Sequence, residues 1–245
     1  MKEKMTSSRK AALWAGILYL VATVAGVLSA ASLGSLFTDG DVLLNVSNNE
    51  TNVILAAMFA LVMAIAVAAI AFMIYPVLKK DSGIKEGLAN WYLGSRVMEG
   101  GIFLVGILGF LSILALSREF TLAGSVDIAY FETLKNIILS VSDYTWMLGY
   151  TVFSVGAIIL YCLFYKSKLI PRWLSVWGII GAPLMLISGL LPLLINEDPN
   201  STLSTMLFAP LAIQELVLAI WLIVKGFKIP EIESGSTMQT NGNNK

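Results

Sequence analysis

The sequence contains no histidine and only one cysteine, and few of its residues carry a charge. Without histidine the chain cannot build imidazole-ligated haem or zinc sites, serine triads or imidazole proton shuttles. Cys162 alone cannot form an intrachain disulfide or a thiolate metal cluster, and we interpret it as a small packing residue. We therefore expect no cofactor and no metal. The formal net charge of zero gives no support to nucleic-acid binding through bulk charge.

Hydrophobic residues make up 57% of the 245, which is typical of membrane helices and far above the content of a soluble domain. A bilayer core of roughly 30 Å requires about 20 helical residues. Because the apolar runs are long and continuous, we expect an all-α polytopic transmembrane bundle. Its six predicted spans are Ala11–Gly34, Asn52–Leu78, Leu88–Leu116, Tyr144–Tyr165, Trp173–Ile195 and Met206–Val224. The first is longer than the apolar region of a signal peptide, which runs about 7–15 residues.

Basic residues favour one orientation of these spans. Of the 16 Lys and Arg residues, all but Arg96, Arg118 and Lys135 lie before the first span or after the second, fourth and sixth. Because Lys and Arg are enriched in cytoplasmic loops, both termini are expected to be cytoplasmic. Aromatic side chains near the same ends, including Trp91 and Tyr92, are typical of residues at the headgroup level.

The chain divides into two regions of different composition. Residues 1–228 hold all the predicted spans, so we expect a single six-helix membrane domain there. Residues 229–245 are rich in Ser, Gly, Asn and Gln, which predicts a disordered cytoplasmic tail.

The loop between the third and fourth spans carries a helical pattern of its own. Its apolar residues fall on one helical stripe, which predicts an amphipathic helix lying on the outer face. Such a helix would act either as a lid over an outward cavity or as an interfacial connector that covers helix ends. The stripe consists of Tyr130, Phe131, Leu134, Ile137, Ile138 and Val141.

Three ionisable residues interrupt the apolar spans. Arg96 and Glu99 lie in the third span, and Glu215 lies in the sixth. A charge at the centre of a membrane helix costs roughly 2.5–3.5 kcal/mol, so it usually faces a partner or a cavity. At a rise of about 1.5 Å per residue, all three lie roughly 12–16 Å from the cytoplasmic ends of their spans. They are therefore predicted to meet in one internal polar layer.

Four further polar residues are predicted to share this layer: Tyr19, Thr23, Ser154 and Gln214. One arginine and two glutamates leave a surplus negative charge if all are ionised. We therefore expect one carboxyl group to be protonated or matched by a bound cation, with Glu215 the better candidate. Arg96 stays charged in either case.

Several functions are compatible with such a layer. The first is a small transporter or binding protein whose midplane site handles a proton, a cation or a small polar solute. The second is a structural or sensory membrane protein in which a buried interhelical salt bridge only stabilises packing. A lipid-acting enzyme, with Glu99 or Glu215 as general acid or base and Arg96 holding an anionic group, is less consistent with the missing histidine and nucleophile motifs. The oligomeric state is not indicated.

Several segments combine charged and aromatic residues at fixed spacing. They are Arg9–Ala12 continuing to Gly26, Asn90–Arg96 with Glu99, Ile170–Leu174 with Trp177 and Gly178, and Ala209 to Phe227 through Glu215. Together they resemble small bacterial six-helix membrane proteins catalogued as domain-of-unknown-function family 4386. The resemblance implies a multi-pass protein of the bacterial cytoplasmic (inner) membrane, and it implies no particular activity.

Overall fold

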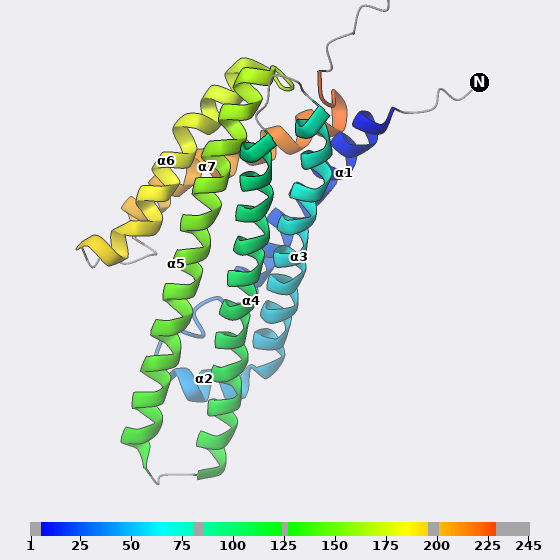
Figure 1. Ribbon diagram of the computed structural model, residues 1–245. Helices are drawn as coiled ribbons and strands as arrows, with labels where there is room; N and C mark the ends of the chain where they lie inside the picture. Colours follow the sequence, from blue (N-terminus) through cyan, green and yellow to red (C-terminus); the bar gives the residue numbers. More distant parts are fainter. Residues whose placement is uncertain (1–5, 81–85, 124–126, 196–200, 229–245) are drawn as a thin grey trace, which may run out of the picture.

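The computed structural model describes residues 6–80, 86–123, 127–195 and 201–228. Within these ranges the chain forms helices and no strand, and six of the helices are long and apolar enough to cross a membrane. The expected all-α polytopic bundle is thereby confirmed (Figure 1). The predicted tail over 229–245 lies outside the described residues. The helices are α1 (Ser7–Leu33), α2 (Val42–Asn48), α3 (Glu50–Lys80), α4 (Glu86–Ala123), α5 (Ile128–Ser167), α6 (Arg172–Ile195) and α7 (Thr202–Val224).

The membrane helices run alternately up and down. Figure 1 places the start of α1 and the end of α7 at one end of the molecule, together with the α3–α4 and α5–α6 helix ends. These are the ends that carry most of the basic residues. The opposite end, which we call the outer end, holds α2, the end of α4 and the start of α5.

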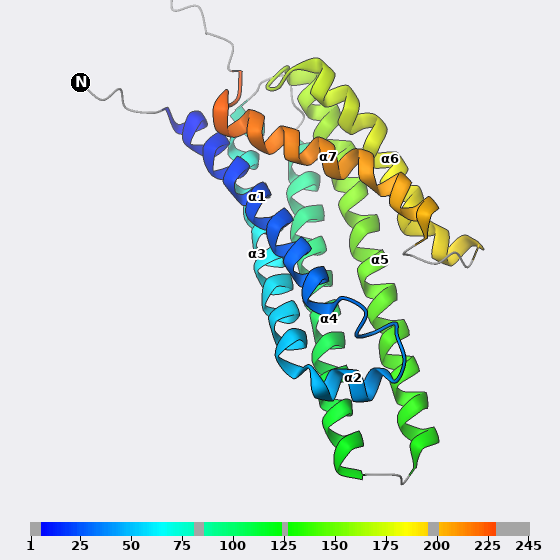
Figure 2. The same ribbon diagram turned by 180° about the vertical axis from the view of Figure 1, so that it is seen from behind.

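The α4–α5 hairpin is longer than a bilayer requires. Its helices contain 38 and 40 residues, which corresponds to about 57 and 60 Å at 1.5 Å per residue. A hydrocarbon core is only roughly 30 Å thick. The hairpin therefore extends past α2 at the outer end, as both ribbon views show (Figures 1 and 2).

The predicted amphipathic segment is helical, but it is not a separate element. It forms the first turns of α5, which continues without a break to Ser167. The chain has no proline between Pro76 and Pro171, so nothing in this region ends the helix before the fourth span. Phe131 is buried against Phe120, with ring centroids 5.5 Å apart, whereas Tyr130 and Ile137 are exposed.

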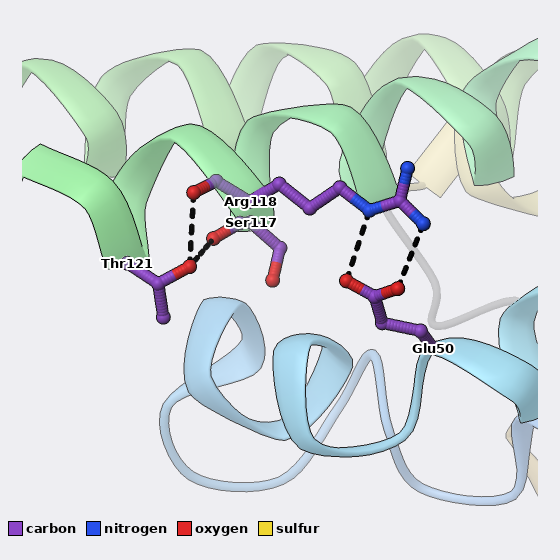
Figure 3. A network of polar contacts seen from close by, with 4 residues as sticks. All are labelled: Glu50, Ser117, Arg118 and Thr121. Carbon is purple, nitrogen blue, oxygen red and sulfur yellow. Dashed lines mark hydrogen bonds and ion pairs between the residues drawn. The ribbon is translucent and has the colours of Figure 1, made fainter.

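The short helix α2 was not expected from the sequence, and it packs against the side of α4 next to the start of α3 (Figure 2). The Asp41 carboxylate caps its first turn by accepting from the backbone N–H of Leu44 at 3.2 Å. The buried Ser117 hydroxyl of α4 donates to the carbonyl of Leu43 at 2.5 Å. Beside it, Arg118 forms two hydrogen bonds to Glu50 at 2.9 and 2.7 Å (Figure 3).

Helix α7 packs between α1 and α6 and crosses the bundle obliquely (Figure 2). Glycines permit both contacts: a Cβ on Gly16 would stand 2.7 Å from the Ala219 carbonyl oxygen, and one on Gly181 would stand 3.2 Å from the backbone of Leu211. Small residues at such crossings allow membrane helices to approach closely. The guanidinium of Arg9 also donates to the carbonyls of Leu222 at 2.9 Å and Ile223 at 2.6 Å, which ties the start of α1 to the end of α7.

Candidate functional site

Arg96 and Glu99 form a buried ion pair in α4. The Arg96 Nη1 atom lies 3.0 Å from Glu99 Oε2, and both side chains are only 3% exposed. The two residues are three positions apart on one helix, so this pair lies within α4 and does not itself join two helices. Glu99 Oε2 lacks a partner in hydrogen-bond geometry, so the contact is an ion pair without the directional bond that usually accompanies one.

Helix α5 provides the space and the aromatic surface around the arginine. The Arg96 guanidinium lies over the Phe153 ring, 4.8 Å from its centroid. Gly156 stands one turn further along α5, where a Cβ would lie 2.3 Å from the Ser95 hydroxyl and 3.9 Å from the Arg96 side chain. The arginine is thus held against α5 by a ring contact, while its Nε has no hydrogen-bond partner.

Glu215 of α7 lies near this pair. It is close enough to Arg96 and Glu99 to interact with both electrostatically. Among the described residues, however, no ion pair joins Glu215 to a basic side chain. Glu215 is also partly exposed, whereas Arg96 and Glu99 are buried. The three charges therefore gather in one region, and one carboxyl group is left without a paired cation.

Tyrosines from three helices surround the charges. Tyr19 of α1, Tyr92 of α4 and Tyr161 of α5 are at most 3% exposed, and each interacts electrostatically with Arg96 and Glu215. Tyr92 is fully buried, so its ring contacts other parts of the bundle and does not face the surrounding lipid. Its position four residues before Arg96, on the same helix face, is the signal that could have assigned it to the site. Nothing in the sequence singled out Tyr161.

Gln214 connects the same region to α6. Its Nε2 donates to the carbonyl of Leu174 at 3.1 Å, and its side chain is fully buried. Its Oε1 and the Tyr161 hydroxyl lie within interaction range of each other without reaching hydrogen-bond geometry. We call the assembled residues the polar cluster: Tyr19, Tyr92, Arg96, Glu99, Tyr161, Gln214 and Glu215.

Several polar atoms of the cluster have no hydrogen-bond partner. They are the Tyr92 and Tyr161 hydroxyls, Arg96 Nε, Gln214 Oε1 and the ion-paired Glu99 Oε2. A buried polar group without a partner costs about 1–3 kcal/mol, so native proteins rarely keep several of them together. Both donors and acceptors are present in this set, which suits a polar ligand that can both accept and donate.

Two predicted members do not offer their hydroxyls to the cluster. Thr23 donates to the Tyr19 carbonyl at 3.0 Å, and Ser154 donates to the Tyr150 carbonyl at 2.8 Å. Both bonds return to the donor's own helix, a common way for Ser and Thr to satisfy hydroxyls in membranes. The positions of Thr23 and Ser154 along their helices matched the depth of the polar cluster. Each hydroxyl nevertheless donates to a backbone carbonyl of its own helix.

A metal centre has no ready ligand set in the described part of the chain, because no group of three or more His, Cys, Asp and Glu side chains could hold an ion there. The polar cluster offers carboxyl groups, a guanidinium, tyrosine hydroxyls and a glutamine amide. These groups can bind a proton, compensate a charge and orient a hydrogen-bonding molecule.

Comparison with curated proteins finds no match, and comparison with solved structures finds none either. A family model described as a domain of unknown function, DUF4386, matches residues 14–226. The matched segment includes every residue of the polar cluster and confirms the resemblance inferred from the sequence. The chain belongs to the DUF4386 family.

Proposed function

We propose that this chain is a multi-pass protein of a bacterial inner membrane whose polar cluster binds a proton, a cation or a small polar solute. The observation that carries the proposal is the placement of the ion pair. Arg96 is paired with Glu99 on its own helix, and Glu215 is left with no ion-pair partner among the described residues. A carboxyl group in that position is available to a ligand.

A purely structural role fits these contacts less well. A salt bridge that stabilises helix packing should connect two helices, but the 3.0 Å pair lies within α4. Helix α7 is instead held by Gly16, Gly181 and the Arg9 hydrogen bonds, none of which needs Glu215. The unpartnered hydroxyls and amide oxygen each add a desolvation cost, which hydrogen bonds to a bound polar ligand would remove.

Charge balance suggests how binding would proceed. Arg96 stays protonated, and it is neutralised by Glu99 at short distance. An ionised Glu215 would then be a net negative charge in a low-dielectric region, which favours either a proton or a bound cation at this carboxyl. The two occupants would compete, so cation binding would release a proton.

Proton release from the purified protein tests this proposal. The protein is held in weakly buffered detergent with a pH indicator, and sodium, potassium, methylammonium or tetraphenylphosphonium chloride is added. We expect at least one of these cations to release protons from the wild type, in proportion to protein and with saturation. Glu215→Gln should abolish the release, because the amide cannot exchange a proton for a cation.

Ser154→Ala is the matched control, because Ser154 is buried at the same site but bonds only to its own helix. It should release protons as the wild type does. The contrary result has two parts. The wild type would release no protons, and Glu215→Gln and Arg96→Ala would lower protein yield to the same extent. That result would favour the structural interpretation.

A further inference from the structure

Aromatic side chains close the bundle between the polar cluster and the outer end. Five aromatic rings, one from the α1–α2 connection and four from α4 and α5, follow one another with successive centroids 5.7, 5.5, 5.0 and 5.7 Å apart. The last ring belongs to Tyr150, which interacts electrostatically with Glu99. A ligand from the outer aqueous side would have to displace this column. Its members, in order, are Phe37, Phe110, Trp146, Phe103 and Tyr150.

The opposite end of the bundle is also packed. Phe227 follows α7 and lies against Phe164 of α5, with ring centroids 6.0 Å apart. The backbone N–H of Lys228 donates to the Leu169 carbonyl at 2.8 Å, which holds this segment over the α5–α6 connection. Leu174 and Phe164 are fully buried there. Water from this side therefore also meets closely packed apolar side chains.

A third possible route to the polar cluster runs sideways, between α1 and α7. The two helices touch where Gly16 meets Ala219. One turn toward the outer end lie Tyr19 on α1 and Glu215 on α7, and from there the helices diverge (Figure 2). Glu215 is partly exposed, and its neighbours Ile213 and Leu216 are 52% and 37% exposed apolar side chains. At roughly 15 Å from the end of the span, the surroundings of this face are hydrocarbon.

The chemistry of the cluster favours a cation. Arg96 is already paired with Glu99, so the free carboxyl of Glu215 is the remaining charge. The hydroxyl groups of three tyrosines lie within electrostatic range of it, and the unpartnered Gln214 Oε1 lies near one of them, that of Tyr161. Aromatic faces attract organic cations, and this attraction is strongest where water is excluded. An inorganic ion crossing the hydrocarbon would have to shed its hydration shell, whereas a hydrophobic organic cation would not.

We infer that the polar cluster takes a hydrophobic organic cation that enters sideways from the hydrocarbon between α1 and α7, with Glu215 as its counter-ion. This inference rests on the proposed binding function and narrows its ligand class. It makes two separable claims: Glu215 is reached from the lipid phase, and its ligand is recognised by positive charge and aromatic rings.

Carbodiimide labelling tests the route. Dicyclohexylcarbodiimide partitions into lipid and modifies protonated carboxyl groups there, whereas a water-soluble carbodiimide modifies those reached through water. The protein is reconstituted in lipid nanodiscs at mildly acidic pH, and each labelled carboxyl is located by peptide mass spectrometry. We expect dicyclohexylcarbodiimide to label Glu215 and not the buried Glu99. The water-soluble reagent should label exposed Glu119 and leave Glu215 unmodified.

Protection from labelling tests the ligand class. Tetraphenylphosphonium and tetraphenylborate have nearly the same size and shape and opposite charges. At about ten times its Kd, a bound ligand should slow labelling of Glu215 roughly ten-fold, because the free fraction falls by that factor. We expect this protection from the phosphonium cation and none from the borate anion. Tyr19→Phe should keep the protection, and Tyr19→Leu should weaken it, because only phenylalanine retains an aromatic face.

Each contrary outcome overturns one claim. Labelling of Glu215 by the water-soluble reagent, or by neither reagent, would overturn the lateral route. Labelling that both ions prevent equally, or that neither prevents, would overturn recognition of a hydrophobic cation. Proton release by small cations in detergent would still be measurable in either case, so a failure of this inference is distinct from a failure of the proposed function.

Discussion

Gly16 of α1 lies so close to Ala219 of α7 that a Cβ at position 16 would stand 2.7 Å from the Ala219 carbonyl oxygen. This crossing sets the distance between the helices that carry Tyr19 and Glu215, one turn away on each. The spacing of the polar cluster therefore depends on the absence of a side chain at a residue outside it.

Gly16→Ala should destabilise the protein by about 1–3 kcal/mol, because the added methyl group forces a backbone atom to move. It should also weaken cation binding at Glu215. Gly94→Ala is the control: a Cβ at Gly94 meets nothing within 4 Å, so alanine there should stabilise α4 by roughly 0.5–1 kcal/mol. Thermal unfolding in detergent measures both changes. Equal effects of the two substitutions would contradict the close crossing.

Arg96 and Glu99 should show strong energetic coupling. Removing one member of a buried pair leaves an uncompensated charge and typically costs about 3–5 kcal/mol. Arg96→Met and Glu99→Met should each destabilise the protein, and the double variant should cost less than the sum of the two. Denaturant unfolding of all four proteins gives the coupling free energy. Additive effects would mean that the 3.0 Å contact contributes no net interaction.

Arg9 should stabilise the C-terminal turn of α7 against local unfolding. Its guanidinium donates to the Leu222 and Ile223 carbonyls, which helix geometry leaves without partners. Arg9→Gln should therefore speed hydrogen exchange at the Lys225 and Gly226 amides, which bond to the Trp221 carbonyl. Exposed Lys10 offers the control, since Lys10→Gln should leave that exchange unchanged. Hydrogen exchange is measured by mass spectrometry. If both variants exchanged as slowly as the wild type, the Arg9 hydrogen bonds would not stabilise the end of α7.

Two contacts at the outer end should differ in strength: the Ser117–Leu43 hydrogen bond and the Glu50–Arg118 pair, of which Figure 3 shows the second. Ser117→Ala removes a buried hydrogen bond to Leu43, and such a loss costs about 0.5–1.5 kcal/mol. The Glu50–Arg118 pair is largely exposed and screened by salt, so Glu50→Gln should cost less, with an effect that fades as salt increases. Unfolding measured at low and high ionic strength gives both values. The reverse ranking would contradict the structure of this end.

The orientation predicted from basic residues can be checked with cysteine labelling. In a Cys162→Ser background, Ser7→Cys and Asn136→Cys introduce exposed single thiols near opposite ends of the molecule. A membrane-impermeant maleimide should label Asn136→Cys on intact cells and Ser7→Cys only after lysis. The opposite pattern would mean that the positive-inside rule fails for this chain.

The architecture and the identity of the charged residues could be predicted from the sequence. Long apolar runs require helices in a bilayer, and Arg96, Glu99 and Glu215 are conspicuous because charge is costly there. Two structural features could not be predicted from short sequence segments taken one at a time. The continuity of α5 depends on the absence of a helix terminator over many residues, and the burial of Tyr92 depends on which side of α4 the other helices occupy.

The amino-acid sequence by itself determined that the chain crosses the membrane repeatedly and that its charges lie at similar depths, because hydropathy and helical rise act on each segment independently. Only the tertiary structure decided which groups are paired. Arg96 forms its ion pair with Glu99 of the same helix, and the Thr23 and Ser154 hydroxyls donate to carbonyls of their own helices. Glu215 is left without a salt bridge in the described chain. These outcomes depend on distances between helices, and those distances are set by contacts such as that of Gly16 with Ala219.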